Sequence, residues 1–386
     1  MPFEPFALER WMSHYETRVT HDIGESGIAP MSMSDLIAFE PEGERAALTQ
    51  SLLELPLGYS EARGTEALRA ALAETYRTAT PDDILVTTGA IEANFLLASV
   101  LISPGDHVVA VYPAYQQLYS VPRGLGADVS LWHISETASG YEFDVDALAA
   151  LVTSATRLII VNTPHNPTGA VLSASDLERI YAMAEAAGAY LVVDEAYRWL
   201  DVPGGLELAP PARDLGPRAI SVGTLSKPFG LPGLRLGWLA APADVAAACW
   251  AHRDYISLSP GKLSDALAVL ALKRIPEVQA RNHAIIAANL ATADRWFVDH
   301  SDLVSWNPPK AGLLALMRYT PDIPSLELSN VLADEYGVLL VPGSAFGFEG
   351  HLRLGVGQDP VIFTEGLDRV ASCLESIRSK AITGAP

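Results

Sequence analysis

Residues 221–238 read Ser-Val-Gly-Thr-Leu-Ser-Lys-Pro-Phe-Gly-Leu-Pro-Gly-Leu-Arg-Leu-Gly-Trp. The run sets Lys227 close to the hydroxyls of Thr224 and Ser226, and Arg235 follows. Its glycines allow sharp turns and a close approach of the backbone to a ligand. Hydroxyls, backbone N–H groups and an arginine fork together suit a phosphate dianion. A lysine among them can condense with a carbonyl on the same ligand.

The composition bounds the class of protein. The chain has 386 residues, 49% hydrophobic and 19% charged, which is enough for a large core and two domains. It has no run of 18 apolar residues, so no membrane span is expected, and its acidic first ten residues do not resemble a secretory signal. The formal net charge of −20 argues against a nucleic-acid partner and is compatible with a cationic substrate.

Cysteine usage is sparse. Cys249 and Cys373 are the only two cysteines, and they show neither metal-ligand spacing nor a disulfide framework. We therefore expect no metal site and two reduced thiols in a cytoplasmic protein.

Short apolar runs alternate with helical stretches in the middle of the chain. Strands are expected at 84–88, 107–112, 157–162, 190–194 and 219–223, with helices at 92–101 and 175–187. This alternation predicts βαβ units and an α/β fold with a mostly parallel sheet covered by helices on both faces. Ligands gather at the carboxyl ends of such strands. Candidate residues stand there: Gly89, Tyr115, Asn166 and Asp194.

The pattern changes after about residue 253. A long helix is expected over 262–297, strands at 312–319, 338–341 and 351–354, and a helix from about 360 to the end. We therefore expect three segments. Residues 1–45 form an N-terminal arm that packs on the small domain, 46–255 form the large ligand-binding domain, and 256–386 form a smaller α+β domain.

Three segments at strand ends carry chemical signals. Residues 87–93 form a strand-to-helix junction, where free N–H groups favour a phosphate. Residues 162–169 hold two prolines and a glycine, which favour a rigid loop. Residues 192–197 end a buried strand in Asp194, whose carboxylate needs a partner. An aromatic ring at 112–115 can stack on a flat ligand ring or simply pack in the core.

Together these segments resemble the class I and II aminotransferases, fold type I enzymes that use pyridoxal phosphate (PLP). The lysine run itself suits a ligand that carries a phosphate at one end and an aldehyde near the other, as PLP does. The resemblance implies that Lys227 binds the cofactor and acts as general base. It also implies that Gly89 and Ala90 help Thr224, Ser226 and Arg235 to hold the phosphate.

The same resemblance assigns the ring and the substrate. Tyr115 stacks on the pyridine ring, Asp194 pairs with its nitrogen, and Asn166 and Tyr197 bond its phenolate oxygen. Arg353, in the run His-Leu-Arg-Leu-Gly at 351–355, grips the substrate carboxylate. His165 and Glu195 are expected to be structural.

A tyrosine-then-glycine segment at 57–64 also matches the family pattern. There Tyr59 would reach the phosphate of a neighbouring subunit, which implies a homodimer with composite active sites. A loop tyrosine with a surface role is the alternative.

Closer resemblance suggests a reaction. Residues 20–28, 223–235 and 253–259 resemble a subfamily that includes capreomycidine synthase, which cyclises a β-hydroxylated arginine in antibiotic pathways. Glu25 is then the candidate for contacting the guanidinium, Asp22 is a second one, and Gly27 lies in the substrate-binding arm. Pro228 departs from the family pattern, because many relatives have a small or polar residue there.

Two other hypotheses remain at this point. An ordinary aminotransferase with a keto-acid acceptor fits the same motifs. A non-catalytic sensor built on this fold is disfavoured, because Lys227, Asp194 and Arg353 are all present.

Overall fold

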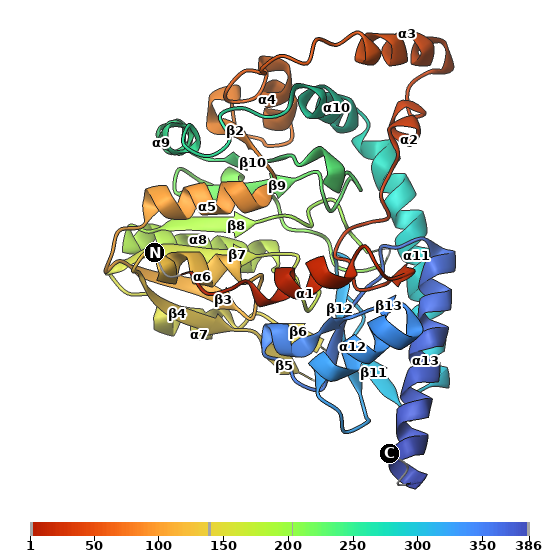
Figure 1. The fold of residues 1–386 in the computed structure, drawn as a ribbon. Helices are drawn as coiled ribbons and strands as arrows, with labels where there is room; N and C mark the ends of the chain where they lie inside the picture. Colours follow the sequence, from red (N-terminus) through yellow and green to blue (C-terminus); the bar gives the residue numbers. More distant parts are fainter. Residues whose placement is uncertain (1–2, 138–139, 203, 384–386) are drawn as a thin grey trace.

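The computed structural model describes residues 3–137, 140–202 and 204–383 (Figure 1). Residues 1–2, in the predicted arm, and 384–386, in the predicted small domain, lie outside the described residues. None of the described helices is long and apolar enough to cross a membrane.

The centre of the molecule is a seven-stranded sheet. Its order is β2 (Ile84–Thr87), β10 (Gly237–Ala240), β9 (Ala219–Thr224), β8 (Tyr190–Asp194), β7 (Thr156–Asn162), β3 (His107–Tyr112) and β4 (Asp128–His133). All neighbours pair in parallel except β10, which is antiparallel to both of its neighbours. The predicted mostly parallel sheet is confirmed, although β10 itself was not expected.

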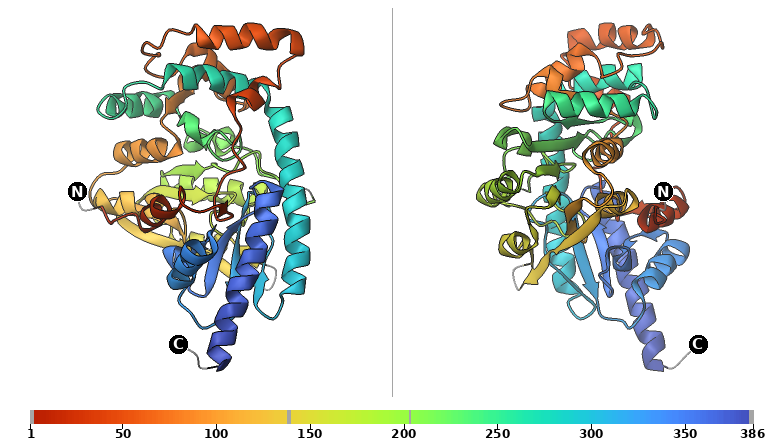
Figure 2. Two further views of the ribbon diagram at one scale, coloured as in Figure 1. Left: turned by 45° about the vertical axis from the view of Figure 1, so that its right-hand side comes forward. Right: turned by 90° about the vertical axis from the view of Figure 1, so that its left-hand side faces the viewer.

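Helices cover both faces of this sheet (Figure 2). They are α5 (Ala90–Leu101), α6 (Gln117–Gly124), α7 (Val145–Leu151), α8 (Ala174–Ala187) and α9 (Ala243–Arg253). Because both faces are covered, the central strands are nearly continuous apolar runs, and one core cluster joins the strands to the helices.

A second, antiparallel sheet follows in the C-terminal part. Its order is β11 (Val304–Trp306), β12 (Leu314–Tyr319), β15 (His351–Gly355) and β14 (Val341–Pro342). It shares a separate core cluster with α11 (Ile275–Asp299), α12 (Ser325–Tyr336) and α13 (Pro360–Thr383). This separate core agrees with an α+β C-terminal part, while the exact domain limits stay a prediction.

Two sequence expectations for this part were wrong in detail. The helix expected over 262–297 is two helices, α10 (Lys262–Lys273) and α11, because Arg274 leaves the helical conformation and Pro276 suits only a helix start. The strand expected over 338–341 is divided between two sheets. Its first half, β13 (Val338–Leu339), pairs with β1 (His21–Asp22), and β14 pairs with β15.

The N-terminal segment crosses between the two parts. The apolar face of α1 (Ala7–Tyr15) packs against α12, β13 and β14, and β1 adds a strand to β13. On its other side the segment reaches the large part, where the Tyr115 hydroxyl donates to Glu9 Oε1 at 2.8 Å. The remaining elements are α2 (Met33–Ile37), α3 (Glu42–Leu53), α4 (Glu66–Ala73), β5 (Ser135–Thr137), β6 (Gly140–Glu142) and the 3₁₀ turns η1 (Pro81–Asp83), η2 (Ala212–Leu215), η3 (Pro232–Leu234) and η4 (Gly343–Phe346).

Candidate active site

A cavity of about 630 Å³ lies at the carboxyl ends of the central strands, between the sheet, the arm and β15. It brings together every predicted site residue except one: Glu25, Gly27, Gly89, Ala90, Tyr115, Asn166, Asp194, Tyr197, Thr224, Ser226, Lys227, Arg235 and Arg353. The exception is Tyr59, which is 87% exposed and outside the cavity lining. The prediction that it reaches a neighbouring subunit therefore stays a prediction.

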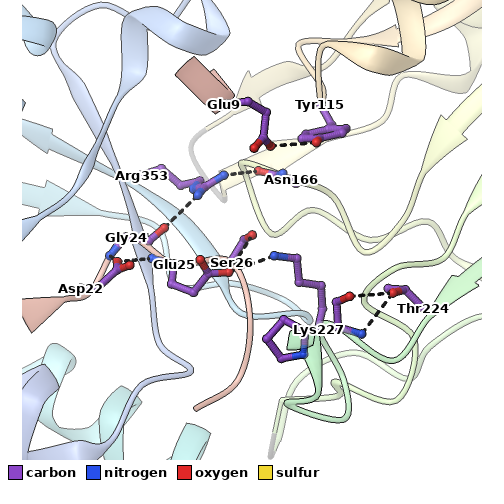
Figure 3. Close-up of polar contacts among 12 residues, drawn as sticks. Glu9, Asp22, Gly24, Glu25, Ser26, Tyr115, Asn166, Thr224, Lys227 and Arg353 are labelled. Carbon is purple, nitrogen blue, oxygen red and sulfur yellow. Dashed lines mark hydrogen bonds and ion pairs between the residues drawn. The ribbon is translucent and has the colours of Figure 1, made fainter. Parts of the chain in front are cut away.

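Lys227 follows β9 and extends toward the arm. Its Nζ donates to Glu25 Oε1 at 2.9 Å (Figure 3). Burial is the largest single influence and lowers the pKa of Lys227, but the charge and hydrogen bond of Glu25, together with the nearby Tyr197, raise the pKa overall. Conversely, Lys227 lowers the pKa of Glu25 to about 2 against the opposing effect of burial. Glu25 therefore keeps the Lys227 side chain in its ammonium form as long as the two side chains are paired.

The hydroxyls of Thr224 and Ser226 meet the start of α5 at one end of the cavity. Thr224 Oγ1 lies 3.0 Å from Ser226 Oγ. Gly89 begins α5 with a φ of +78°, and a Cβ there would lie 3.1 Å from Arg235 Nη2. Gly237 lets β10 approach the start of α5 closely, because a Cβ added to this residue would lie 2.4 Å from the Ala90 nitrogen. The result is a compact seat of hydroxyls, helix N–H groups and a guanidinium, which suits a phosphate.

Asp194 ends β8 at the opposite side of this seat and is buried. Asn94 Nδ2 donates to its Oδ2 at 2.7 Å, and the Ala196 N–H donates to its Oδ1 at 3.0 Å. Burial raises the pKa of Asp194 in spite of these bonds. No ion pair joins this carboxylate to a cation among the described residues. A ring nitrogen that carries a proton would supply the missing charge.

Arg353 on β15 is almost fully buried and is held from two sides. Its Nη1 donates to Asn166 Oδ1 at 3.2 Å, and its Nη2 donates to the Gly24 carbonyl at 2.8 Å (Figure 3). Its Nε has no partner in the described structure. The Asn166 N–H in turn donates to Asn162 Oδ1 at 2.8 Å. A rigid guanidinium with an unused Nε donor fits a carboxylate ligand.

Tyr115 and Tyr197 line the cavity, whereas His165 does not. Tyr115 lines the cavity, and burial followed by the nearby Glu9 raises the pKa of its phenol. Tyr197 also lines it, and burial raises its pKa too. His165 lies outside the lining, bonds to Thr168 Oγ1 and the Pro113 carbonyl, and burial lowers its pKa to about 3. His165 is therefore a neutral ring whose two hydrogen bonds stabilise the loop at 162–169.

Four carboxylates of the N-terminal segment also line the cavity: Glu9, Glu16, Asp22 and Glu25. Asp22 accepts the N–H groups of Gly24 and Glu25 at 3.1 and 2.8 Å. Burial, and then the charge of Glu25, raises the pKa of Asp22 to about 7. This wall of the cavity is therefore strongly acidic.

Sequence reasoning missed Glu9, Glu16 and Asn94. Glu9 and Glu16 are seven residues apart, which sets them on one side of a helix, but that signal needs the start of α1 to be known. Asn94 is a polar residue within the buried apolar stretch of α5, a pattern that could have been noticed.

Comparison with known proteins identifies this constellation. The family model "Aminotransferase class I and II" matches residues 46–370. The chain belongs to the class I and II aminotransferase family. Its cofactor is PLP, and its fold is that of the fold type I enzymes, as the motifs predicted.

Three relatives narrow the comparison. Capreomycidine synthase of Streptomyces vinaceus is 32% identical over 349 residues, covering 90% of this chain and 88% of the relative. An arginine–pyruvate transaminase of Pseudomonas aeruginosa is 28% identical over 390 residues, covering 96% of each chain. The solved PLP-dependent cyclase OrfR superposes with a TM-score of 0.87 at 34% identity, covering 97% of this chain and 98% of its own.

The residues present fit PLP at both ends. The seat built by Thr224, Ser226, Arg235 and the start of α5 suits its phosphate. Asp194 is buried and has no cationic partner among the described residues, which suits its ring nitrogen. Lys227 lines the same cavity. We therefore keep, as proposals, the individual cofactor roles that the aminotransferase motifs predicted.

In this aminotransferase site, Arg353→Lys is expected to raise the KM for amino-acid substrates by about 10–100-fold. The reason is that lysine cannot form the two parallel bonds of a guanidinium, a loss of about 1.5–3 kcal/mol for a charged hydrogen bond. Steady-state kinetics check this, with Arg318→Lys on the neighbouring strand β12, where the side chain is exposed, as the matched control. An unchanged KM in Arg353→Lys would contradict the assignment.

The raised pKa of Asp22 predicts a pH-dependent stability. Between its ordinary pKa near 4 and its folded pKa of about 7, the folded chain holds a proton that the unfolded chain has lost, so stability falls as pH rises. Asp22→Asn is expected to remove this fall and to melt roughly 2 °C above the native apoenzyme at pH 8, with less difference at pH 5.

Asp35→Asn is the control of opposite sign. Hydrogen bonds from Ser32 lower the pKa of Asp35, so this carboxylate stabilises the fold once ionised, and that stability is lost as pH falls. Thermal melts of the three proteins across pH 5 to 8 measure both effects. A pH-independent difference for Asp22→Asn would show that Asp22 titrates normally.

Proposed function

We propose that this enzyme is a cyclase of antibiotic biosynthesis that acts on an L-arginine hydroxylated at Cβ. It removes the hydroxyl as water and closes a ring by attack of a guanidine nitrogen at Cβ. The observation that carries the proposal is the charge of the cavity wall. It holds more carboxylates than an amino acid with a neutral side chain would use.

The charges can be assigned one by one. In the loaded enzyme Lys227 is committed to the cofactor aldehyde, Arg235 to the phosphate and Arg353 to the substrate carboxylate. Asp194 faces the ring nitrogen. That leaves the arm carboxylates Glu9, Glu16, Asp22 and Glu25 without an assigned cation. A guanidinium side chain offsets Glu25, the partly buried carboxylate that gives up Lys227 as its partner, and the exposed carboxylates Glu9 and Glu16 add to the attraction of a cation.

Glu25 is the residue we propose for the guanidinium. In the structure it already binds one cation, the Lys227 ammonium, with its Oε1 at 2.9 Å. When Lys227 is joined to the cofactor, the same carboxylate is free to accept the substrate's N–H groups. The similarity to an arginine–pyruvate transaminase supports a guanidinium substrate. The similarity to the PLP-dependent cyclase supports ring closure, and that to capreomycidine synthase agrees with the resemblance of the sequence motifs.

The residues divide the chemistry as follows. When bound, PLP supplies an acceptor for the electron pair left at Cα. Arg353 holds the substrate carboxylate, and the Lys227 Nζ, once released by the incoming amine, takes the Cα proton as general base. Glu25 keeps the guanidinium next to Cβ, which makes the ring closure intramolecular. Loss of the Cα proton and of the hydroxide removes one water. The attacking guanidinium nitrogen then gives up one N–H proton as the C–N bond forms at Cβ, and Cα takes one proton back, so the net change is the loss of one water.

Transamination is the second candidate, and the similarity to the arginine–pyruvate transaminase favours it. Both reactions begin with removal of the Cα proton, and they differ in the need for a keto acid. The deciding experiment supplies purified enzyme with PLP and β-hydroxy-L-arginine, without keto acid. Repeated turnover in which each substrate loses the mass of one water supports the cyclase. A single turnover that leaves pyridoxamine phosphate and a keto acid makes the enzyme an aminotransferase.

Glu25→Gln is expected to lower kcat/KM for the guanidinium substrate by about 10–100-fold, the worth of one charged hydrogen bond. Turnover or binding of an amino acid with a neutral side chain of equal length should change little. Glu136→Gln, at an exposed carboxylate of β5, is the matched control. Equal losses for charged and neutral substrates would show that Glu25 serves Lys227 and not the side chain.

A homodimer with Tyr59 entering the neighbouring active site is part of the proposal. Tyr59, Leu57 and Tyr255 are large, apolar and at least four-fifths exposed, which is unusual unless a partner covers them. Light scattering of the purified protein measures the mass. A monomer at micromolar concentration would rule out the composite site.

A further inference from the structure

Asn94 is a buried amide in an apolar stretch of helix. It lies in α5 between Ala93 and Leu97, both fully buried, and is itself 8% exposed. A buried amide is costly unless it is hydrogen-bonded. Its Nδ2 donates to Asp194 Oδ2 at 2.7 Å, across 100 residues of sequence, and its Oδ1 has no partner among the described residues. The bond to Asp194 therefore offsets part of the cost of burying this amide.

The charge of Asp194 fixes the direction of this bond. If the Asn94 amide were reversed, two acceptor oxygens would face each other at 2.7 Å and repel. As a donor, Asn94 favours the ionised carboxylate, as does the Ala196 N–H on the other oxygen. Burial works against both. The two donors hold the carboxylate from α5 on one side and from the chain after β8 on the other.

Asn94 also stands one helical turn after Ala90. Residues four apart lie on one face of a helix. The first turn of α5 belongs to the proposed phosphate seat, and Asn94 touches the carboxylate proposed for the ring nitrogen. A single rigid helix therefore sets the spacing between the two ends of the cofactor site.

We propose that Asn94 is a positioning residue: its hydrogen bond fixes the orientation of the Asp194 carboxylate, which would pair with the ring nitrogen of the cofactor. The proposal rests on the assignment of Asp194 to the ring nitrogen. It does not depend on whether the reaction is a cyclisation or a transamination.

Asn94→Leu, which has a similar shape and no donor, is the principal test. We expect its affinity for PLP, measured by absorbance titration of the apoenzyme, to fall about 10-fold. The kcat should fall about 10–100-fold with little change in KM for the amino acid. The pH titration of the visible absorption band of the bound cofactor should shift, which a purely structural role would not cause.

Asn94→Asp supplies a rescue. Two carboxyl groups at this distance share a proton, so the introduced carboxyl group can donate to Asp194 at low pH only. The kcat of this variant should therefore rise toward the native value as pH is lowered, whereas that of Asn94→Leu should not.

Leu97→Ala, one turn along the same helix, is the matched control. It creates a cavity and lowers the melting temperature without touching Asp194, so its cofactor absorption should be normal. The proposal is overturned if Asn94→Leu behaves like Leu97→Ala, with lower melting temperature and native PLP affinity, kcat and absorption. It is also overturned, through its premise, if Asp194→Asn leaves the cofactor absorption and its pH titration unchanged.

Discussion

Lys227→Ala is expected to lower kcat by at least about 10⁴-fold. The substitution removes the amine that binds the cofactor aldehyde, and it removes the base that takes the Cα proton, each a large contribution in its own right. The fold should persist, because within the described part of the chain the lysine side chain bonds to Glu25 alone. Single-turnover kinetics with PLP-loaded enzyme measure the loss, and the visible spectrum shows whether the cofactor is still held.

The matched control for this prediction is Lys310→Ala. Lys310 Nζ lies 3.3 Å from Glu142 Oε1, and Lys310 does not line the cavity. Its substitution should therefore leave kcat unchanged. Small primary amines added to Lys227→Ala should restore part of the activity, because they can act as the missing base in solution. Loss of a general base typically lowers the rate by about 10²–10⁴-fold. A kcat of Lys227→Ala above about one hundredth of the native value would therefore contradict the role given to Lys227.

Asp194→Asn is expected to have the second-largest effect, with kcat lowered by about 10²–10³-fold. An amide keeps the shape but cannot balance a protonated ring nitrogen, and leaving a buried charge without its partner costs about 3–5 kcal/mol. The KM for the amino acid should change less, because Arg353 is untouched. Steady-state kinetics and an absorbance titration with PLP measure the two parameters.

Glu195→Gln is the control that the chain itself offers. Glu195 is the next residue, is buried as Asp194 is, and accepts bonds from Ser221 Oγ at 2.7 Å and from the Ala212 N–H. It does not line the cavity. Its substitution should lower the melting temperature while kcat stays within a few-fold. Equal losses of kcat in both variants would mean that Asp194 acts only through the stability of the fold.

Much of this architecture could be predicted from the sequence because its signals are local. Each central strand is a short apolar run followed by a turn, and His107–Tyr112 and Tyr190–Asp194 were delimited correctly. The motifs stand at strand ends, and a parallel sheet brings those ends to one edge. The side chains of Lys227, Asn166 and Asp194 therefore meet in one cavity, as expected.

What could not be predicted depends on contacts between distant segments. Strand β10 is only four residues long and joins the sheet between β2 and β9, so its sequence carries little signal of its own. Glu9 and Glu16 enter the cavity only because α1 packs on the C-terminal part. The bond of Asn94 to Asp194 needs the helix and the strand to be placed together. The role proposed for Tyr59 needs a second chain.

We propose that this PLP site selects a guanidinium side chain. The most direct measurement compares the binding of L-arginine and L-citrulline to the PLP-loaded enzyme by the change in cofactor absorbance. The two amino acids have nearly the same shape, but the citrulline side chain is neutral. We predict that arginine binds at least about 30-fold more tightly, the equivalent of about 2 kcal/mol for a charged hydrogen bond. Equal affinities would contradict the claim that the arm carboxylates recognise a guanidinium.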